Sequence, residues 1–326
     1  MTVSSIRALL KHVAIRGLGS RLVVDRKLRR IAASGWITIL NLHRVAPFDR
    51  STYPPLDPGL FDYLLGFVKE RFEVVTFAEA AATPAGVRPR LILSFDDGYR
   101  DFYDVAAPLL AKHGLRANQN VVPELIETGL PPLNVHVQDF IGQAPLEAVN
   151  ALEIPGFSHR RPVRSRFHFG TEASTFIKTR SIEEQRALAR AVLPQIAAVA
   201  EFTPTALMTL DQVKEMGREH EIGAHSFSHA SMGFESDDYL RDDVTKCRDY
   251  FQSRLGLPLT VYALPNDSVR PSQVEVLREA GIPHILLVEE DFTAPGSDVY
   301  RRFTFAAESQ AEVRLRATGV YRWPRG

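Results

Sequence analysis

The chain has 326 residues, of which 45% are hydrophobic and 24% are charged, as in an ordinary globular protein with a sizeable core. Lysine plus arginine and aspartate plus glutamate number 39 each, so no basic excess favours a nucleic-acid partner, and none is expected. The single cysteine, Cys247, excludes a disulfide framework within the chain.

Residues 1–35 form a basic segment with eight lysines or arginines and one acidic residue, Asp25. We expect a helical extension that either lies on an anionic membrane surface or packs on the rest of the protein with a solvated basic face. Basic residues interrupt any signal-peptide core, and no run of about 18 apolar residues exists, so we expect a cytoplasmic protein, membrane-associated if the helix binds lipid. Apolar residues recur at helical spacing in its first part: Ile6, Leu9, Leu10, Val13 and Ala14.

From residue 36 to the C-terminus, strands and helices alternate in two stretches separated by an irregular region. Repeated strand–helix units indicate an α/β fold with a parallel sheet whose strands are buried on both faces. Residues of about 130–205 are interpreted as an insertion, which could be a lid, a specificity element or a packed excursion. Strands are predicted at 36–42, 72–75, 91–95, 118–122, 221–224, 259–263, 285–288 and 299–305, and helices at 57–71, 100–113, 181–200, 210–219, 236–255 and 271–281.

Two adjacent carboxylates, Asp96 and Asp97, directly follow a predicted apolar strand and precede Gly98. Neighbouring carboxylates repel each other unless a cation or a proton lies between them. Adjacent side chains also point in different directions, so one can bind a metal ion while the other faces a water molecule. The alternative interpretation is a solvent-exposed turn, for which Asp-Asp-Gly is common.

The segment from His225 to His229 also follows a predicted parallel strand. Two imidazoles four residues apart can converge on one ion, and one carboxylate would complete the three-ligand set of an open catalytic site. The alternative is two unrelated histidines. Since both motifs follow parallel strands, whose carboxyl ends meet at one edge of the sheet, we favour a shared metal site.

Here the sequence resembles the polysaccharide deacetylase family, the NodB-homology carbohydrate esterases. Ser94-Phe95-Asp96-Asp97-Gly98-Tyr99 matches the first motif of the family, and Glu221-Ile222-Gly223-Ala224-His225-Ser226-Phe227-Ser228-His229 matches the second. The resemblance covers about residues 36–125 and 205–305. It implies that residues 36–326 form a distorted (β/α) barrel, a single domain with an insertion at about 130–205.

The resemblance also implies roles for these residues. Asp97, His225 and His229 would hold one divalent metal ion, with zinc expected and cobalt, nickel or manganese as alternatives. The metal would lower the pKa of a bound water and polarise an amide carbonyl. Asp96 would then be the general base that takes a proton from the attacking water.

Other expected site residues rest on weaker matches. His43, in Leu42-His43-Arg44, occupies the position from which some family members supply the acid that protonates the leaving amine, with Leu42 replacing the usual tyrosine. The third motif is altered to Ala263-Leu264-Pro265-Asn266-Asp267, where Asn266 could still supply a backbone N–H to the oxyanion. Arg301 or Arg302 would orient Asp96.

The expected activity is therefore metal-dependent removal of an N-acetyl group from an acetylated amino sugar in a poly-, oligo- or lipid-linked saccharide. Deformylation or O-deacetylation at the same site is one alternative, because each reaction needs the same activated water. A carbohydrate-binding relative that has lost catalysis is another, which the altered third motif favours.

Overall fold

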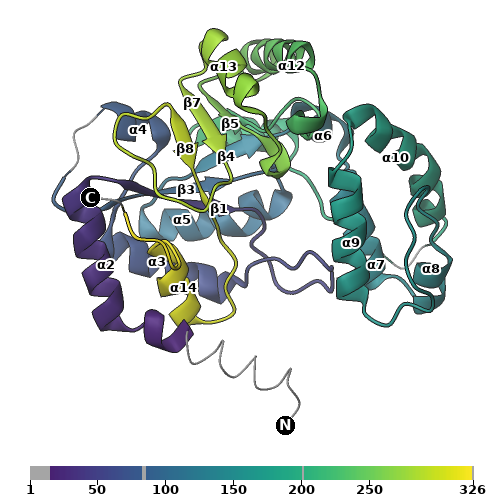
Figure 1. Ribbon diagram of the computed structural model, residues 1–326, viewed down its shortest axis with the longest axis horizontal. Coiled ribbons are helices and arrows are strands. Elements are labelled where there is room, and N and C mark those ends of the chain that lie inside the picture. Colours follow the sequence, from purple (N-terminus) through teal and green to yellow (C-terminus); the bar gives the residue numbers. More distant parts are fainter. Residues whose placement is uncertain (1–14, 83–85, 200–201, 325–326) are drawn as a thin grey trace.

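Figure 1 shows a computed structural model of the chain, which describes residues 15–82, 86–199 and 202–324. Its central feature is a parallel sheet that curls into a nearly closed barrel, with helices around it. The strand order in the described part is β8-β7-β6-β5-β4-β3-β1-β9, with β2 beside β3. The predicted α/β barrel is confirmed. The strands are β1 (Ile37–Leu42), β2 (Glu73–Val74), β3 (Arg90–Phe95), β4 (Asn118–Val121), β5 (Glu221–Ala224), β6 (Val261–Ala263), β7 (His284–Leu287), β8 (Val299–Arg301) and β9 (Phe303–Thr304).

A single extended segment joins the two edges of the sheet. β8 pairs with β7 at one edge and β9 pairs with β1 at the other, and only Arg302 separates them. All six residues of β1 and of β3 are buried, because helices cover the outside of the barrel and side chains fill its interior. The carboxyl ends of the strands consequently meet around one opening, where polar side chains can gather.

Helices on the outside of the barrel begin and end at residues with clear local preferences. The side chain of Asp57 caps α3, Thr209 and Gln212 form a capping box at α11, and Gly114 ends α5 in the left-handed conformation. These helices are α2 (Arg21–Ser34), α3 (Pro58–Arg71), α4 (Phe77–Ala82), α5 (Ala107–His113), α6 (Pro123–Thr128), α11 (Leu210–Met216), α12 (Asp237–Tyr250), α13 (Pro271–Glu279) and α14 (Gln310–Ala317).

The described part of the basic N-terminal segment packs on the barrel. Val24, Leu28 and Ile31 of α2 are buried in the main hydrophobic core. This is the packed arrangement that the sequence left open for residues 1–35. The apolar positions from Ile6 to Ala14 lie outside the described residues. No helix in the described ranges is long and apolar enough to cross a membrane.

Residues 133–197 form a group of helices beside the barrel (Figure 1). They have a hydrophobic cluster of their own, which includes Val137, Phe140, Phe169 and Val192. The prediction of an irregular region was wrong for α7 to α9, which are regular helices. The helices of the group are α7 (Leu133–Gln143), α8 (Leu146–Ala151), α9 (Arg166–Lys178) and α10 (Ile182–Ala197).

A barrel loop at residues 50–52 packs closely against α7 and α9. A Cβ atom at Gly142 would lie 2.2 Å from the carbonyl oxygen of Arg50, and one at Gly170 would lie 2.1 Å from Oγ1 of Thr52. Thr52 Oγ1 also donates a hydrogen bond of 3.0 Å to the carbonyl oxygen of Gln138. Glycine is therefore required at both helix positions for this close approach.

Candidate metal and catalytic site

The residues expected at the strand ends line one cleft of about 680 Å³. His43 follows β1, Asp96 and Asp97 follow β3, and His225 follows β5. The structure thus brings together side chains that are far apart in the sequence. His229 and Asn266 line the same cleft.

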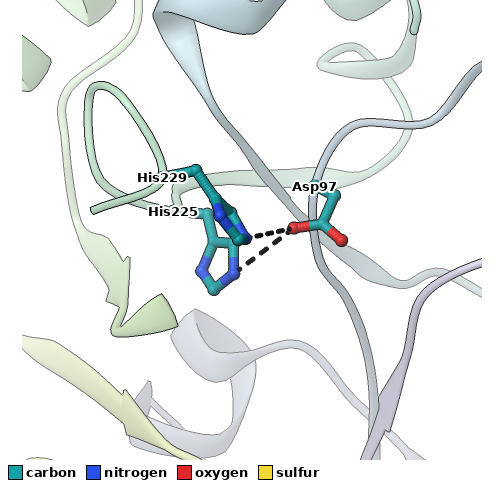
Figure 2. A group of neighbouring side chains, drawn as sticks. All are labelled: Asp97, His225 and His229. Carbon is teal, nitrogen blue, oxygen red and sulfur yellow. Dashed lines mark ion pairs between the residues drawn. The ribbon is translucent and has the colours of Figure 1, made fainter. Parts of the chain in front are cut away.

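Asp97, His225 and His229 form the group of side chains that could hold a metal ion (Figure 2). Asp97 Oδ1 lies 3.4 Å from Nε2 of His225 and 3.2 Å from Nε2 of His229. The three ligand atoms lie within 4.8 Å of one another, and all three residues are buried. No other set of three such residues in the described ranges meets this criterion.

The charges and lone pairs of this group fit a divalent cation. Nδ1 of His225 lies 3.0 Å from the carbonyl oxygen of Ala263, so in the tautomer that donates this bond the Nε2 lone pair faces Asp97. Burial lowers the pKa of His225 to about 4, although the charges of Asp96 and Asp97 oppose this shift. The ring is therefore neutral at neutral pH. Asp97 Oδ1 is buried without a hydrogen-bond partner. A carboxylate oxygen that faces imidazole nitrogens is the arrangement a cation would satisfy.

Left-handed backbone turns direct the ligands into the cleft. Asp97 has φ of 76°, Ser226 of 60° and His229 of 62°, a region that non-glycine residues seldom adopt. Gly98, with φ of 77°, continues the first turn. Strained conformations of this kind persist only where the surrounding structure holds them in place.

Asp243, on the buried face of α12, holds the loop of residues 225–231, here called the histidine loop. Ser226 Oγ donates to it at 2.9 Å, the backbone N–H of Phe227 at 3.1 Å, and the hydroxyl of Tyr262 at 2.6 Å. Burial raises the pKa of Asp243, and these donors oppose that rise. Asp243 was assigned no role from the sequence. The only feature that could have identified it is the position of a carboxylate on the apolar face of a helix.

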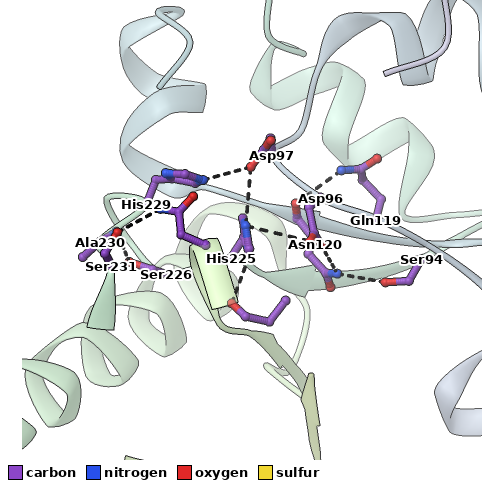
Figure 3. Close-up of polar contacts among 12 residues, drawn as sticks. Ser94, Asp96, Asp97, Gln119, Asn120, His225, Ser226, His229, Ala230 and Ser231 are labelled. Atoms are coloured by element: carbon purple, nitrogen blue, oxygen red, sulfur yellow. Dashed lines mark hydrogen bonds and ion pairs between the residues drawn. The ribbon is translucent and has the colours of Figure 1, made fainter. Parts of the chain in front are cut away.

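Asp96 lies beside the metal-binding group and has donors of its own. Its Oδ1 accepts hydrogen bonds of 2.8 Å from Arg302 and 2.8 Å from Asn120 Nδ2. Figure 3 shows Asn120 next to Asp96, whose Oδ2 lies 3.9 Å from Nε2 of His225. Burial raises the pKa of Asp96, but the charge of Arg302 and its hydrogen bond to Asp96 oppose this rise, and the value falls to about 2. Asp96 is therefore ionised at neutral pH.

Arg302, and not Arg301, orients Asp96. The side chain of Arg302 is fully buried, whereas that of Arg301 is 47% exposed and forms an ion pair of 2.5 Å with Glu289. The expectation of an orienting role is therefore wrong for Arg301. The physical reason is the alternation of side chains along a strand, which points neighbouring residues to opposite faces.

His43 is half-buried in the cleft and lies edge-on to Tyr53, with ring centroids 6.1 Å apart. Burial lowers the pKa of His43, and the charges of Asp97 and Asp96 oppose this shift. Leu42 is buried in the core, so the tyrosine beside the histidine comes from the loop after β1. Tyr53 was not singled out in the sequence, because nine residues lie between it and His43.

Asn266 adopts a left-handed conformation with φ of 61°. Its side-chain Nδ2 donates a hydrogen bond of 2.9 Å to Oγ of Ser231, and that hydroxyl donates at 2.6 Å to the carbonyl oxygen of Lys178. Asn266 thereby connects the turn after β6, the histidine loop and the end of α9. A contribution of its backbone N–H to an oxyanion site stays a prediction.

Comparisons with known proteins agree with the geometry. The model of the family described as polysaccharide deacetylase matches residues 168–285, a range that includes the motif from His225 to His229. The fold is similar to that of Streptococcus pyogenes deacetylase PplD in complex with acetate, at 18% identity and a TM-score of 0.56, over 87% of this chain and 98% of that one.

Two further solved structures share the fold. IcaB from Ammonifex degensii is 17% identical with a TM-score of 0.55, over 87% of this chain and 97% of that one. The BpsB deacetylase domain from Bordetella bronchiseptica is 15% identical with a TM-score of 0.51, over 82% and 95%. No curated protein sequence matches the chain. The resemblance to polysaccharide deacetylases of the NodB-homology type, predicted from two motifs, is thus confirmed.

Proposed function

We propose that this chain is a metal-dependent hydrolase that removes the N-acetyl group from an acetylated amino sugar in a poly-, oligo- or lipid-linked saccharide. One observation carries the proposal: Asp97, His225 and His229 form a three-ligand group, and a separately held carboxylate lies beside it. Zinc is the expected ion, with cobalt, nickel and manganese as alternatives. The name of the matching family supports the substrate class.

The proposed mechanism divides the work among residues of the cleft. A divalent cation held by the three ligands would supply Lewis acidity, which polarises an acyl carbonyl and acidifies water. Asp96 would accept the proton of the attacking water, because Arg302 and Asn120 hold its carboxylate ionised and fixed. His43, which lines the same cleft, would donate a proton to the leaving amine from its protonated imidazole and become neutral.

An Asp96→Asn variant tests this division of roles. The substitution keeps the shape of the side chain and leaves the three ligands in place, so metal content should match that of the wild type. Acetate release from an N-acetylated oligosaccharide should fall by roughly 100-fold or more, the usual contribution of a general base. Unchanged acetate release would contradict the assignment.

Product analysis separates this proposal from the two alternatives. Formate from an N-formylated sugar, or acetate from an O-acetylated sugar without release of a free amine, would favour the other hydrolyses at the same site. Saccharide binding without any of these products, in metal-loaded protein, would favour the carbohydrate-binding relative.

A further inference from the structure

The helices of residues 133–197 supply one wall of the cleft that holds the metal-binding group. The wall is mostly uncharged and polar, and such side chains suit the hydroxyl groups of a sugar. On α9 the cleft-lining residues recur at i, i+3, i+4 and i+7, which places them on one helix face. From α7 and α9, the described residues that line the cleft are Asn134, Val135, Gln138, Thr171, Ser174, Thr175 and Lys178.

Lys178 is the charged residue in this wall, and it lies at the end of α9 nearest the reactive groups. It lines the same cleft as Asp97 and His43. Burial lowers the pKa of Lys178, and the charge of Asp97 opposes this shift. Its backbone is fixed, because the Lys178 carbonyl oxygen accepts a hydrogen bond from Ser231 in the histidine loop. The backbone of Lys178 is therefore tied to the histidine loop, and its side chain lines the cleft.

The ammonium group of Lys178 has no ion pair within 4.0 Å in the part of the chain that the structure describes. Of the other charged residues that line the cleft, Asp96 is paired with Arg302 and Glu312 with Arg316 at 3.1 Å, whereas Asp267 and Glu308 form no ion pair within 4.0 Å in the described ranges. A cation held by Asp97 would offset the remaining negative charge nearby. A half-buried ammonium without a counter-ion is costly, and an anionic ligand would stabilise it.

We propose that Lys178 binds an anionic substituent, a carboxylate or a phosphate, near the N-acetyl group, so that the preferred substrate is an acidic saccharide. This inference rests on the proposed function for its reaction, but the recognition can be measured by binding alone. Neutral hydroxyl and amide groups of α7 and α9 would contact the rest of the sugar. Lysine suits this role because it is a compact point charge that accepts either anion.

Acetate release should be measured with three substrates: an uncharged N-acetylglucosamine disaccharide, a glucuronate–N-acetylglucosamine disaccharide and N-acetylglucosamine 1-phosphate. One acidic substrate should exceed the neutral one in kcat/KM by roughly tenfold to 100-fold, as for a hydrogen bond to a charged group. Whether the uronate or the phosphate is preferred identifies the anion.

Lys178→Met should abolish this preference by raising KM for the acidic substrate, with little change for the neutral one, and Lys178→Arg should retain it. Arg164→Met, which removes an exposed charge from the loop before α9, is the matched control and should behave as the wild type. Calorimetric titration of each acidic saccharide into metal-loaded protein should show weaker binding to Lys178→Met by a similar factor.

The outcomes separate this inference from the proposed function. Equal kcat/KM for neutral and acidic substrates, or a similar loss of kcat on all three in Lys178→Met, would overturn the inference while acetate release still supports the deacetylase. Lys178-dependent binding of an acidic saccharide without acetate release would support the inference and contradict the deacetylase.

Discussion

At the scale of single residues, the site depends on side chains that support the metal-binding group and Asp96 without being metal ligands themselves. Asp243 fixes the loop that carries His225 and His229 by accepting hydrogen bonds from Ser226 and Phe227 of that loop, and it also accepts one from Tyr262 of β6. Arg302, which lies between β8 and β9, holds Asp96 in place through an ion pair of 2.8 Å. Groups of this kind set the orientation of ligands, so their loss should change affinity or rate more than the fold.

Asp243→Asn should weaken metal affinity by roughly tenfold to 100-fold, because an amide cannot accept from all the donors of the histidine loop. The neighbouring Asp242 is exposed on the same helix, so Asp242→Asn is the matched control and should leave affinity unchanged. Competition with a chelator measures both. Equal affinities for the two variants would show that Asp243 does not support the site.

Arg302→Met should lower kcat with the metal still bound, since Asp96 loses its charged partner and its pKa should rise from the low value that Arg302 maintains. Arg301→Met removes an exposed ion pair with Glu289 and should have little effect. Steady-state kinetics together with metal content decide the matter. A large loss of kcat in Arg301→Met, with Arg302→Met unaffected, would reverse the assignment.

At the scale of elements, the junction between α11 and β5 contains a histidine that must stay neutral. His220 is buried, its Nδ1 accepts a hydrogen bond from the backbone N–H of Ala117, and its ring packs edge-on against Phe102. Burial, with a smaller contribution from Arg116, lowers the pKa of His220 to about 4. The unfolded chain would titrate near 6.5.

Folding stability should therefore fall as the pH drops from about 6.5 to about 4, because the unfolded chain binds a proton that the folded one resists. The full effect would be on the order of 3 kcal/mol. Chemical denaturation at several pH values should show a smaller decrease for His220→Gln than for the wild type. Identical pH profiles would show that His220 titrates normally.

At the scale of the whole molecule, the barrel and the helices of residues 133–197 together form the cleft, and α2 of the N-terminal segment packs on the barrel. Peripheral membrane contact through residues 1–35 remains a proposal. Its test must respect the packing of α2, because a truncation that reaches residue 30 would remove Val24 and Leu28 from the core.

Removal of residues 1–14 should leave thermal stability close to that of the wild type, since the deletion ends before the buried face of α2. If this segment contacts lipid, binding to anionic vesicles should decrease by roughly 1 kcal/mol for each basic residue lost, Arg7 and Lys11. Co-sedimentation with vesicles measures this. Unchanged vesicle binding would exclude residues 1–14 as the contact.

The barrel and its central residues could be predicted because each motif directly follows a strand, and parallel strands end at one opening. Asp97, His225 and His229 were found in this way. Tyr53, Asp243 and Lys178 were not, because only tertiary packing brings them to the site.

The choice between Arg301 and Arg302 depends on which side chain faces the barrel interior. A shift of one residue in register reverses that direction, so a pattern of two adjacent arginines cannot decide it. The helices α7 to α9 were missed because the prolines and basic residues of the segments that connect them, at 131–132, 155 and 159–164, are typical of loops. The part that α7 and α9 play in lining the cleft could therefore not be predicted from the sequence.

The most direct test of the central claim is metal content, measured by mass spectrometry on purified wild type, His225→Ala and the control His168→Ala, whose histidine is exposed on α9. We predict about one divalent ion per chain in the wild type and the control, and far less in His225→Ala. No metal in the wild type after incubation with zinc, cobalt, nickel or manganese, or equal content in His225→Ala, would contradict the proposed site.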